Sequence, residues 1–226
     1  TNLVTEMDAR AEALILGRLR EAFPDDAILS EEMGAASGRS GRRWIVDPLD
    51  GTTNYAHGLP LFGVSIGLEA EGRVMLGVVY DPVHDELFVA ERGAGAFVND
   101  RKLAVSRATT LDESLLATGF PYDIRETDDN NLREYAAFSV RAQGARRLGS
   151  AVLYLAWTAA GRFDGYWELR VGAWDVAAGS LLVEEAGGRV TSLDGTPLDL
   201  DRPSVLASNG IIHDEMLKVL REVRTR

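Results

Sequence analysis

Residues 44–54 read Trp-Ile-Val-Asp-Pro-Leu-Asp-Gly-Thr-Thr-Asn, an apolar run that leads directly into two acids. The run Trp44–Val46 predicts a short buried strand. Asp47 is well suited to cap a helix, and Pro48 to be the first helical residue. Because positions three apart share one face of a helix, we expect the carboxylates of Asp47 and Asp50 to converge.

Two such carboxylates about 4 Å apart repel each other by ~4 kcal/mol at an effective dielectric near 20. No basic residue lies between Val46 and Asn54, so a shared proton, a basic side chain from elsewhere or a metal ion must offset the repulsion. The donors are oxygens and the chain has no cysteine, which favours Mg²⁺, or Mn²⁺ as a substitute, over Zn²⁺. Gly51 and Thr52 offer N–H groups and a hydroxyl at the expected helix start, where phosphate binds well.

Two further acidic segments lie at comparable places in the predicted structure. Glu31 follows the apolar strand predicted at Ala27–Leu29, and Asp175 lies at the start of an Ala-rich helix predicted at Trp174–Ala186. Each acid taken alone is typical of a capped helix or a surface turn. Together the three segments supply four candidate metal ligands, namely Glu31, Asp47, Asp50 and Asp175.

Composition excludes several classes of protein. The chain has 226 residues, of which 46 % are apolar and 26 % are charged, so it has enough apolar content for a full core and is neither disordered nor fibrous. No run approaches the roughly 18 apolar residues of a membrane helix. With 24 basic and 35 acidic residues the net charge is −11, which argues against nucleic-acid binding. The lack of cysteine excludes disulfides and thiolate sites.

The first residues carry no secretion signal that we recognise. Residues 1–20 lack a basic start, a continuous apolar run and a small-residue cleavage site. The chain begins at Thr1 rather than Met, so we expect further residues before it in the full protein. The cytoplasm is the expected location.

A helix is predicted from Thr5 to Phe23, and Pro24 ends it. Thr5 and Asp8 are good helix-capping types, and we favour that role over metal binding for both. Apolar runs punctuated by turn residues then predict an antiparallel sheet, and Gly34–Gly41 predicts a flexible connection. The strands of this sheet are expected at Val64–Leu68, Val74–Tyr80, Leu87–Ala90 and Lys102–Val105.

Beyond Leu111 strands alternate with helices, which indicates a mixed or parallel sheet covered by helices. We therefore predict an N-terminal α+β region with the antiparallel sheet and the acidic loop at 1–110, and a C-terminal α/β region at 111–226. The later strands are expected at 114–118, 163–168, 189–191 and 205–207, and the helices at 132–140, 151–160, 174–186 and 212–223.

Competing motifs for phosphoryl transfer are absent from the sequence. It has no G-x-x-x-x-G-K-[ST] loop and no kinase motif set. Phosphatases with an aspartate nucleophile use acids two residues apart after a strand, whereas Asp47 and Asp50 are three apart. This spacing fits metal chelation better.

The sequence resembles the inositol monophosphatase family of the lithium-sensitive, Mg²⁺-dependent phosphatase superfamily. The resemblance is specific and covers nearly the whole chain. The matching segments are Leu3–Asp8, Ser30–Glu32, Trp44–Asn54, Gly77–Tyr80, Gly149–Ala151, Gly165–Glu168, Trp174–Gly179 and Glu185–Gly188, in family order.

The resemblance implies a layered α-β-α-β-α sandwich, a homodimer and two or three Mg²⁺ ions per site. It implies that Glu31, Asp47 and the Leu49 carbonyl bind the first ion. Asp47, Asp50 and Asp175 would bind the second, so that Asp47 bridges the two. A third, weaker ion near Glu31 occurs in some relatives.

The family mechanism would need no covalent intermediate. One Mg²⁺ would lower the pKa of a water that Glu31 and Thr52 orient for in-line attack, and the second would stabilise the leaving oxygen. The residues implied to contact substrate are Asp50 and Asp175, Gly51 and Thr52 for the phosphate oxygens, and Gly149, Ser150, Ala151 and Glu168 for the alcohol portion.

The expected function is a Mg²⁺-dependent phosphomonoesterase acting on inositol 1-phosphate or a similar polyol or sugar phosphate. Fructose-1,6-bisphosphatase and histidinol-phosphatase activities are alternatives, and a non-catalytic interaction protein is a remote one. Arg146 and Arg147 are either a solvated or dimer-contact pair or a clamp for a second anionic group. The three histidines, His57, His84 and His213, lack the spacing of a metal site and are expected in loops or at the surface.

Overall fold

The computed structural model describes residues 4–224, and an eight-stranded sheet occupies the first half of them. The strand order is β2-β1-β3-β4-β5-β6-β7-β8, and every neighbouring pair is antiparallel except β1 with β3. The strands are β1 (Ala27–Ser30), β2 (Gly34–Ala36), β3 (Arg42–Asp50), β4 (Gly63–Ala70), β5 (Arg73–Asp81), β6 (Glu86–Glu91), β7 (Gly95–Val98) and β8 (Arg101–Lys102).

The parallel pair is the feature of this sheet that matters most for the acids. Ser30 of β1 lies opposite Val46 of β3. Because parallel strands run toward the same edge of a sheet, the residues that follow, Glu31 and Asp47, reach the same edge.

A second sheet of five strands is built from the rest of the chain. Its order is β10-β9-β11-β13-β12, with β9 parallel to β10 and β11, and β13 antiparallel to β11 and β12. The N-terminal sheet is therefore largely antiparallel and this C-terminal sheet is mixed, as predicted. The strands are β9 (Leu115–Thr118), β10 (Gly144–Arg146), β11 (Gly165–Glu168), β12 (Arg189–Ser192) and β13 (Val205–Ser208).

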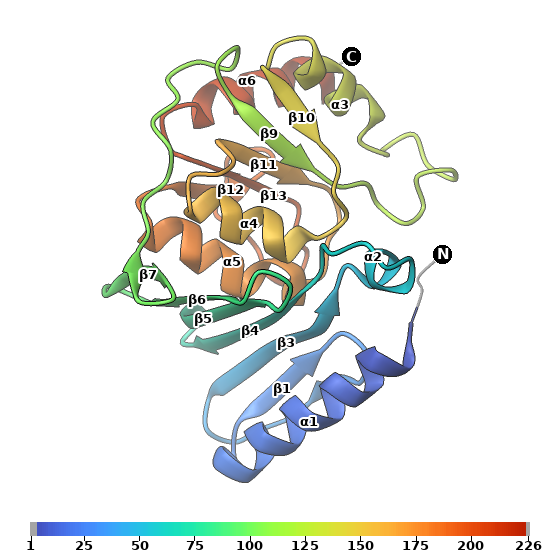
Figure 1. Cartoon of the computed structure of the whole chain (residues 1–226), viewed down its shortest axis with the longest axis vertical. Coiled ribbons are helices and arrows are strands. Elements are labelled where there is room, and N and C mark those ends of the chain that lie inside the picture. Colours follow the sequence, from blue (N-terminus) through green and yellow to red (C-terminus); the bar gives the residue numbers. More distant parts are fainter. Residues whose placement is uncertain (1–3, 225–226) are drawn as a thin grey trace.

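Helices separate and cover the two sheets, which gives the α-β-α-β-α layering that was expected (Figure 1). One helix covers the outer face of the larger sheet, two lie between the sheets, and two cover the smaller sheet. In that order they are α1 (Glu6–Ala22), α4 (Ala151–Ala159) with α5 (Ala173–Glu185), and α3 (Leu132–Ser139) with α6 (His213–Arg224). The short α2 (Thr52–Ala56) follows β3.

Small residues allow the middle layer to pack closely. A side chain at Gly77 of β5 would place its Cβ 2.6 Å from the Ala178 carbonyl oxygen of α5. One at Gly179 would come 2.5 Å from Leu155 of α4. Since real Cβ atoms do not approach so closely, α5 can lie against both neighbours only where these positions lack a side chain. This packing fixes the start of α5, and with it the position of Asp175.

The first helix begins as predicted. Thr5 is its N-cap, and its hydroxyl accepts a hydrogen bond from the backbone of Met7 at 3.2 Å. In return, Asp8 accepts one from the Thr5 backbone N–H at 2.8 Å. The apolar side of the helix packs through Leu16 against Trp44 and its neighbours. Leu3, which belongs to the first matching segment, lies outside the described residues.

Several short edge elements differ from the predictions. The segment Gly34–Gly41, expected to be a flexible connection, contributes β2 to the sheet edge. The strand expected at Lys102–Val105 is limited to Arg101–Lys102, and β7 and β10 were not predicted. These elements have two to four residues, too few to show a periodic pattern.

The division of the chain near residue 110 stays a prediction. It falls between β8 of the larger sheet and β9 of the smaller one. Among residues 4–224, no helix is both long and apolar enough to cross a bilayer.

His213 is fully buried at the start of α6, so the prediction that it lies in a loop or at the surface is wrong. Its ring nitrogens lie 2.9 Å from the hydroxyl oxygens of Thr191 and Ser208. Burial, and to a smaller extent the nearby Arg189, lowers the pKa of His213 from 6.5 to about 4. The folded protein therefore keeps this ring neutral at a pH where the unfolded chain protonates it.

We expect this histidine to weaken the fold in acid. The unfolded state binds the proton more readily than the folded state. The contribution of the neutral ring to the free energy of unfolding is therefore complete above pH 6.5 and declines as the pH falls toward 4, by up to about 3 kcal/mol. Urea unfolding across this range should show a steeper loss of stability for the wild type than for His213→Gln. Parallel curves for the two proteins would contradict the assignment.

Candidate active site

The two acids after the buried strand lie on a β-bulge. β3 continues through both to Asp50, so the prediction that Asp47 caps a helix and Pro48 begins it is wrong. Asp47 lies opposite Ser65 of β4 and Asp50 opposite Gly63, which leaves one extra residue in β3. Pro48 has no N–H to donate to a sheet, and a bulge is one of the few places in a sheet that accept it.

The bulge explains how the two carboxylates converge. In a regular strand, residues three apart point to opposite faces, and one extra residue returns them to the same face. Convergence was thus predicted correctly but for the wrong local structure. The helix α2 begins only at Thr52, after Gly51, whose φ of +87° suits glycine.

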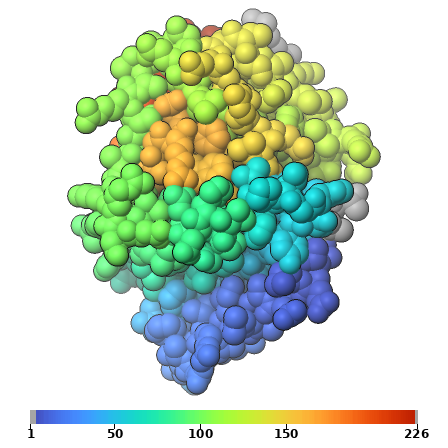
Figure 2. Space-filling model, viewed as in Figure 1, coloured from blue at the N-terminus to red at the C-terminus, as the bar shows by residue number. Residues whose placement is uncertain are grey.

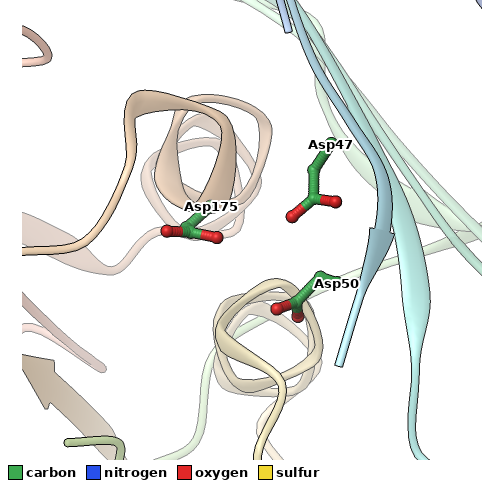
Figure 3. A group of neighbouring side chains, drawn as sticks. All are labelled: Asp47, Asp50 and Asp175. Carbon is green, nitrogen blue, oxygen red and sulfur yellow. The ribbon is translucent and has the colours of Figure 1, made fainter. Parts of the chain in front are cut away.

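A third aspartate from the middle layer joins them. One carboxylate oxygen each from Asp47, Asp50 and Asp175 lie within 4.8 Å of one another (Figure 3). Asp175 is in the first turn of α5, where it accepts a hydrogen bond of 2.5 Å from the Gly172 N–H. The strand end and the helix start therefore direct three acids into one space.

The hydrogen bonds of these acids leave oxygen atoms available. Asp47 is 1 % exposed, and one of its oxygens accepts from the Leu49 N–H at 3.0 Å. Its other oxygen, Oδ2, is buried and has no hydrogen-bond partner. Asp50 uses one oxygen for both the Ser150 hydroxyl and the Val152 N–H, the latter at 2.9 Å.

Burial and mutual repulsion raise the pKa of every acid in this group. Burial raises the pKa of Asp47 and of Asp175 well above the usual range, and the neighbouring Asp50 raises both further. Burial also raises the pKa of Asp50 to about 6, against the effect of its hydrogen bonds with Ser150 and Val152. Ionised together, these groups are unfavourable without a compensating positive charge.

Glu31 stands next to the three aspartates but outside their closest grouping. It follows β1 directly, and its N–H donates to the Val46 carbonyl of β3 at 3.2 Å. Burial, followed by repulsion from Asp50 and Glu32, raises the pKa of Glu31 to about 7.

The donor set fits a divalent cation. No Lys or Arg within residues 4–224 forms an ion pair with the four acids. A buried carboxylate oxygen without a partner, beside two further acids, has the charge and hardness that Mg²⁺ and Mn²⁺ prefer.

Thr52 is held by a residue that we predicted only as a helix cap. Its hydroxyl lies 2.9 Å from Oδ1 of Asp8 and 3.0 Å from the Leu49 carbonyl oxygen. Asp8 is fully buried and uses its other oxygen for the capping contacts with Thr5. Asp8 therefore caps α1 and orients Thr52 at once. The sequence feature that could have indicated the contact with Thr52 is that Asp8 belongs to a segment that carries the family resemblance.

A cleft of about 300 Å³ opens above the acids. Its wall combines α2 and the turn before α4, and Asn54 of α2 donates to the Leu148 carbonyl at 2.7 Å. In Figure 2 the cyan surface around α2 lies against the yellow surface of the turn and of α4. Of the residues predicted for the site, Asp47 and Leu49 lie buried beneath the cleft. Those that line it are Glu31, Asp50, Gly51, Thr52, Gly149, Ser150, Ala151, Glu168 and Asp175.

Glu168 occupies the part of the cleft predicted for the alcohol. It accepts a hydrogen bond of 2.7 Å from the Tyr166 hydroxyl, and a side chain at Gly119 would overlap its carboxylate. Burial raises the pKa of Glu168 to about 7, and Tyr166 and Arg147 oppose that rise.

The two neighbouring arginines separate in space. Arg147 lines the cleft and its guanidinium lies over the Phe120 ring, 5.5 Å from the centroid, whereas Arg146 does not line it. Tyr122 and Arg170 are among the residues of the cleft wall that sequence reasoning missed. Both lie in or against the irregular segment 119–131, where no periodic pattern exists to place them.

Comparison with known proteins supports the resemblance found in the sequence. The model of the inositol monophosphatase family matches residues 1–225. An inositol-1-monophosphatase of Mesorhizobium japonicum is 48 % identical over 97 % of this chain and 83 % of its own. A protein of Pseudomonas aeruginosa named Nus factor SuhB is 46 % identical over 91 % of this chain and 78 % of its own.

Solved structures agree with this result. The inositol monophosphatase from Anabaena superposes with a TM-score of 0.93 at 50 % identity, covering 96 % of this chain and 86 % of that one. The match of one family to nearly every residue, together with relatives close to half identical, establishes that the chain belongs to the inositol monophosphatase family.

Proposed function

We propose that the protein is a Mg²⁺-dependent phosphomonoesterase that hydrolyses inositol 1-phosphate. The observation that carries this proposal is the cluster of Asp47, Asp50 and Asp175 beside the cleft, in which Asp47 keeps a buried oxygen without a hydrogen-bond partner. The relative in Mesorhizobium japonicum named inositol-1-monophosphatase supports the choice of substrate.

The proposed metal ligands come from the three segments already described. Glu31, Asp47 and the Leu49 carbonyl would hold one ion, and Asp47, Asp50 and Asp175 a second. A third ion near Glu31 and replacement of Mg²⁺ by Mn²⁺ belong to the same proposal. When bound, the cations supply positive charge that neutralises the phosphate, makes water more acidic and stabilises the leaving oxygen.

The protein's own groups then orient the reactants. Glu31 orients the attacking water and can accept a proton from it. Thr52, fixed by Asp8 at 2.9 Å, presents its hydroxyl oxygen to the same water. Rigid placement of this kind favours in-line attack because the reactants need no further ordering.

The other proposed contacts divide the substrate into two parts. Asp50 and Asp175 would lie beside the phosphate as metal ligands, and Gly51 and Thr52 would hold its oxygens. The alcohol would lie against Gly149, Ser150, Ala151 and Glu168. There the carboxylate of Glu168 accepts hydrogen bonds from hydroxyl groups.

The acidic character of this subsite favours a polyol over a second phosphate, although Arg147 nearby weakens that preference. Fructose-1,6-bisphosphatase or histidinol-phosphatase activity is therefore the alternative among enzymes. The relative named Nus factor SuhB is a reason to test for a purely non-catalytic role. Such a role would leave the clustered acids without a function. Homodimerisation, sensitivity to lithium and a cytoplasmic location stay predictions.

A substrate panel tests the proposed activity. With Mg²⁺, we expect kcat/KM for inositol 1-phosphate to exceed those for fructose 1,6-bisphosphate and histidinol phosphate by about 10-fold or more, because each unfavourable polar contact costs roughly that factor. Release of phosphate should stop when the metal is chelated. A higher value for fructose bisphosphate would change the substrate assignment, and activity independent of metal would contradict the mechanism.

Asp47→Asn tests the shared metal ligand. We expect kcat to fall by about 1,000-fold or more, because the proposed bridging carboxylate is lost while its shape is kept. Circular dichroism should remain that of the wild type. Asp81→Asn is the matched control, since it removes an equally buried carboxylate from the end of β5. Near-normal activity of Asp47→Asn would overturn the assignment.

A further inference from the structure

Tyr122 is an aromatic residue of the cleft that no part of the mechanism uses. It lines the cleft beside the acids, yet 71 % of its surface is exposed. Within the described part of the chain its hydroxyl makes no hydrogen bond. An exposed phenol in a polar cleft, with its donor unused, is available to a ligand.

Tyr122 shares the wall of the cleft with three of the proposed metal ligands, Glu31, Asp50 and Asp175. Although much of its surface is exposed, desolvation by the surrounding cleft raises the pKa of Tyr122, and so do four carboxylates, in the order Asp175, Glu31, Asp50 and Asp47. These are the four proposed metal ligands, between which the phosphate would lie.

The loop that carries Tyr122 is fixed at both ends. The segment 119–131 connects β9 to α3 and extends beside α2 (Figure 1). Asn131 ties its two ends together, since its amide donates to the Thr118 hydroxyl at 2.8 Å and to the Gly119 carbonyl at 2.6 Å. The same side chain accepts from the Trp167 indole at 2.7 Å.

Arg170 holds the middle of the loop. It lies just beyond β11 and donates to Asp123 at 2.6 Å and to Asp129 at 3.2 Å. Arg224 of α6 binds Asp129 from the other side at 3.0 Å. Since Asp123 is the neighbour of Tyr122 in the chain, the ion pair with Arg170 restrains the residue that presents the phenol.

We propose that Tyr122 is a substrate-binding residue whose hydroxyl donates a hydrogen bond to the phosphate group, and that Arg170 is the positioning residue that holds it there. This inference rests on the proposed phosphatase function. A hydrogen bond to an ionised acceptor is stronger than one between neutral groups, and a phosphate oxygen is such an acceptor. The contact would be common to all substrates, because every phosphate monoester carries the same group.

Tyr122→Phe removes only the hydroxyl. We expect kcat/KM to fall about 10-fold both for inositol 1-phosphate and for phenyl phosphate, whose alcohol has no hydroxyl groups to bind. The dissociation constant of inorganic phosphate, measured by calorimetry on the Mg²⁺-loaded protein, should rise by a similar factor. Tyr80→Phe, which removes a phenol bound to Asp85 outside the cleft, should change none of these values.

The positioning role of Arg170 has its own measurement. Arg170→Gln should weaken phosphate binding about 3- to 10-fold, and Arg170→Lys should restore part of it. When Arg170→Gln is combined with Tyr122→Phe, phosphate binding should weaken little further, because both substitutions remove the same contact between the phenol and the phosphate. Asp123→Asn should behave as Arg170→Gln does. The control is Asp128→Asn, since Asp128 is exposed and has no ion pair among the described residues.

Each outcome bears on a distinct claim. Unchanged phosphate binding and kinetics in Tyr122→Phe would overturn the inference while the proposed function stands. A loss confined to inositol 1-phosphate would place the hydroxyl on the alcohol and also overturn it. If the wild type hydrolyses no phosphate ester in Mg²⁺, the proposed function fails. Phosphate binding by the wild type and by Tyr122→Phe still decides whether Tyr122 contacts phosphate.

Discussion

Repulsion among buried carboxylates is the constraint around which this molecule is arranged. Two unit charges 4.8 Å apart repel each other by about 3 kcal/mol at an effective dielectric of 20, and three aspartates approach within that distance. Protein hydrogen bonds relieve Asp50 in part but leave one oxygen of Asp47 without any partner. The folded chain thus keeps an unfavourable local charge that bound cations would turn into an attractive one.

The layers of the fold serve to hold these charges together. The parallel pairing of β1 with β3 brings Glu31 to the same edge as Asp47, and the bulge in β3 turns Asp50 to the same side. Close packing of α5 on β5 then places Asp175 opposite them. Both sheets and the middle layer contribute, so the site forms only when most of the chain has folded.

Sequence patterns predicted those parts that depend on neighbouring residues. The first helix with its cap at Thr5, the longer strands and the four acids all follow from local spacing and composition. The bulge could not be predicted, because Pro48 and two acids also satisfy the rules for a helix start. The second contact of Asp8, with Thr52, joins segments 44 residues apart, and the ion pairs of Arg170 span more than 40. Such contacts depend on the tertiary structure and leave no periodic signal in the chain.

The most direct test of the central claim is the free energy of unfolding of the wild type and of Asp47→Asn at pH 8, each with a chelator and with saturating Mg²⁺. If repulsion among ionised carboxylates strains the metal-free site, the variant is the more stable protein in chelator, by about 1–3 kcal/mol. With Mg²⁺ the order reverses, because only the wild type gains the full stabilisation of ligand binding. A wild type that is more stable than the variant without metal, and gains nothing from Mg²⁺, would contradict the account.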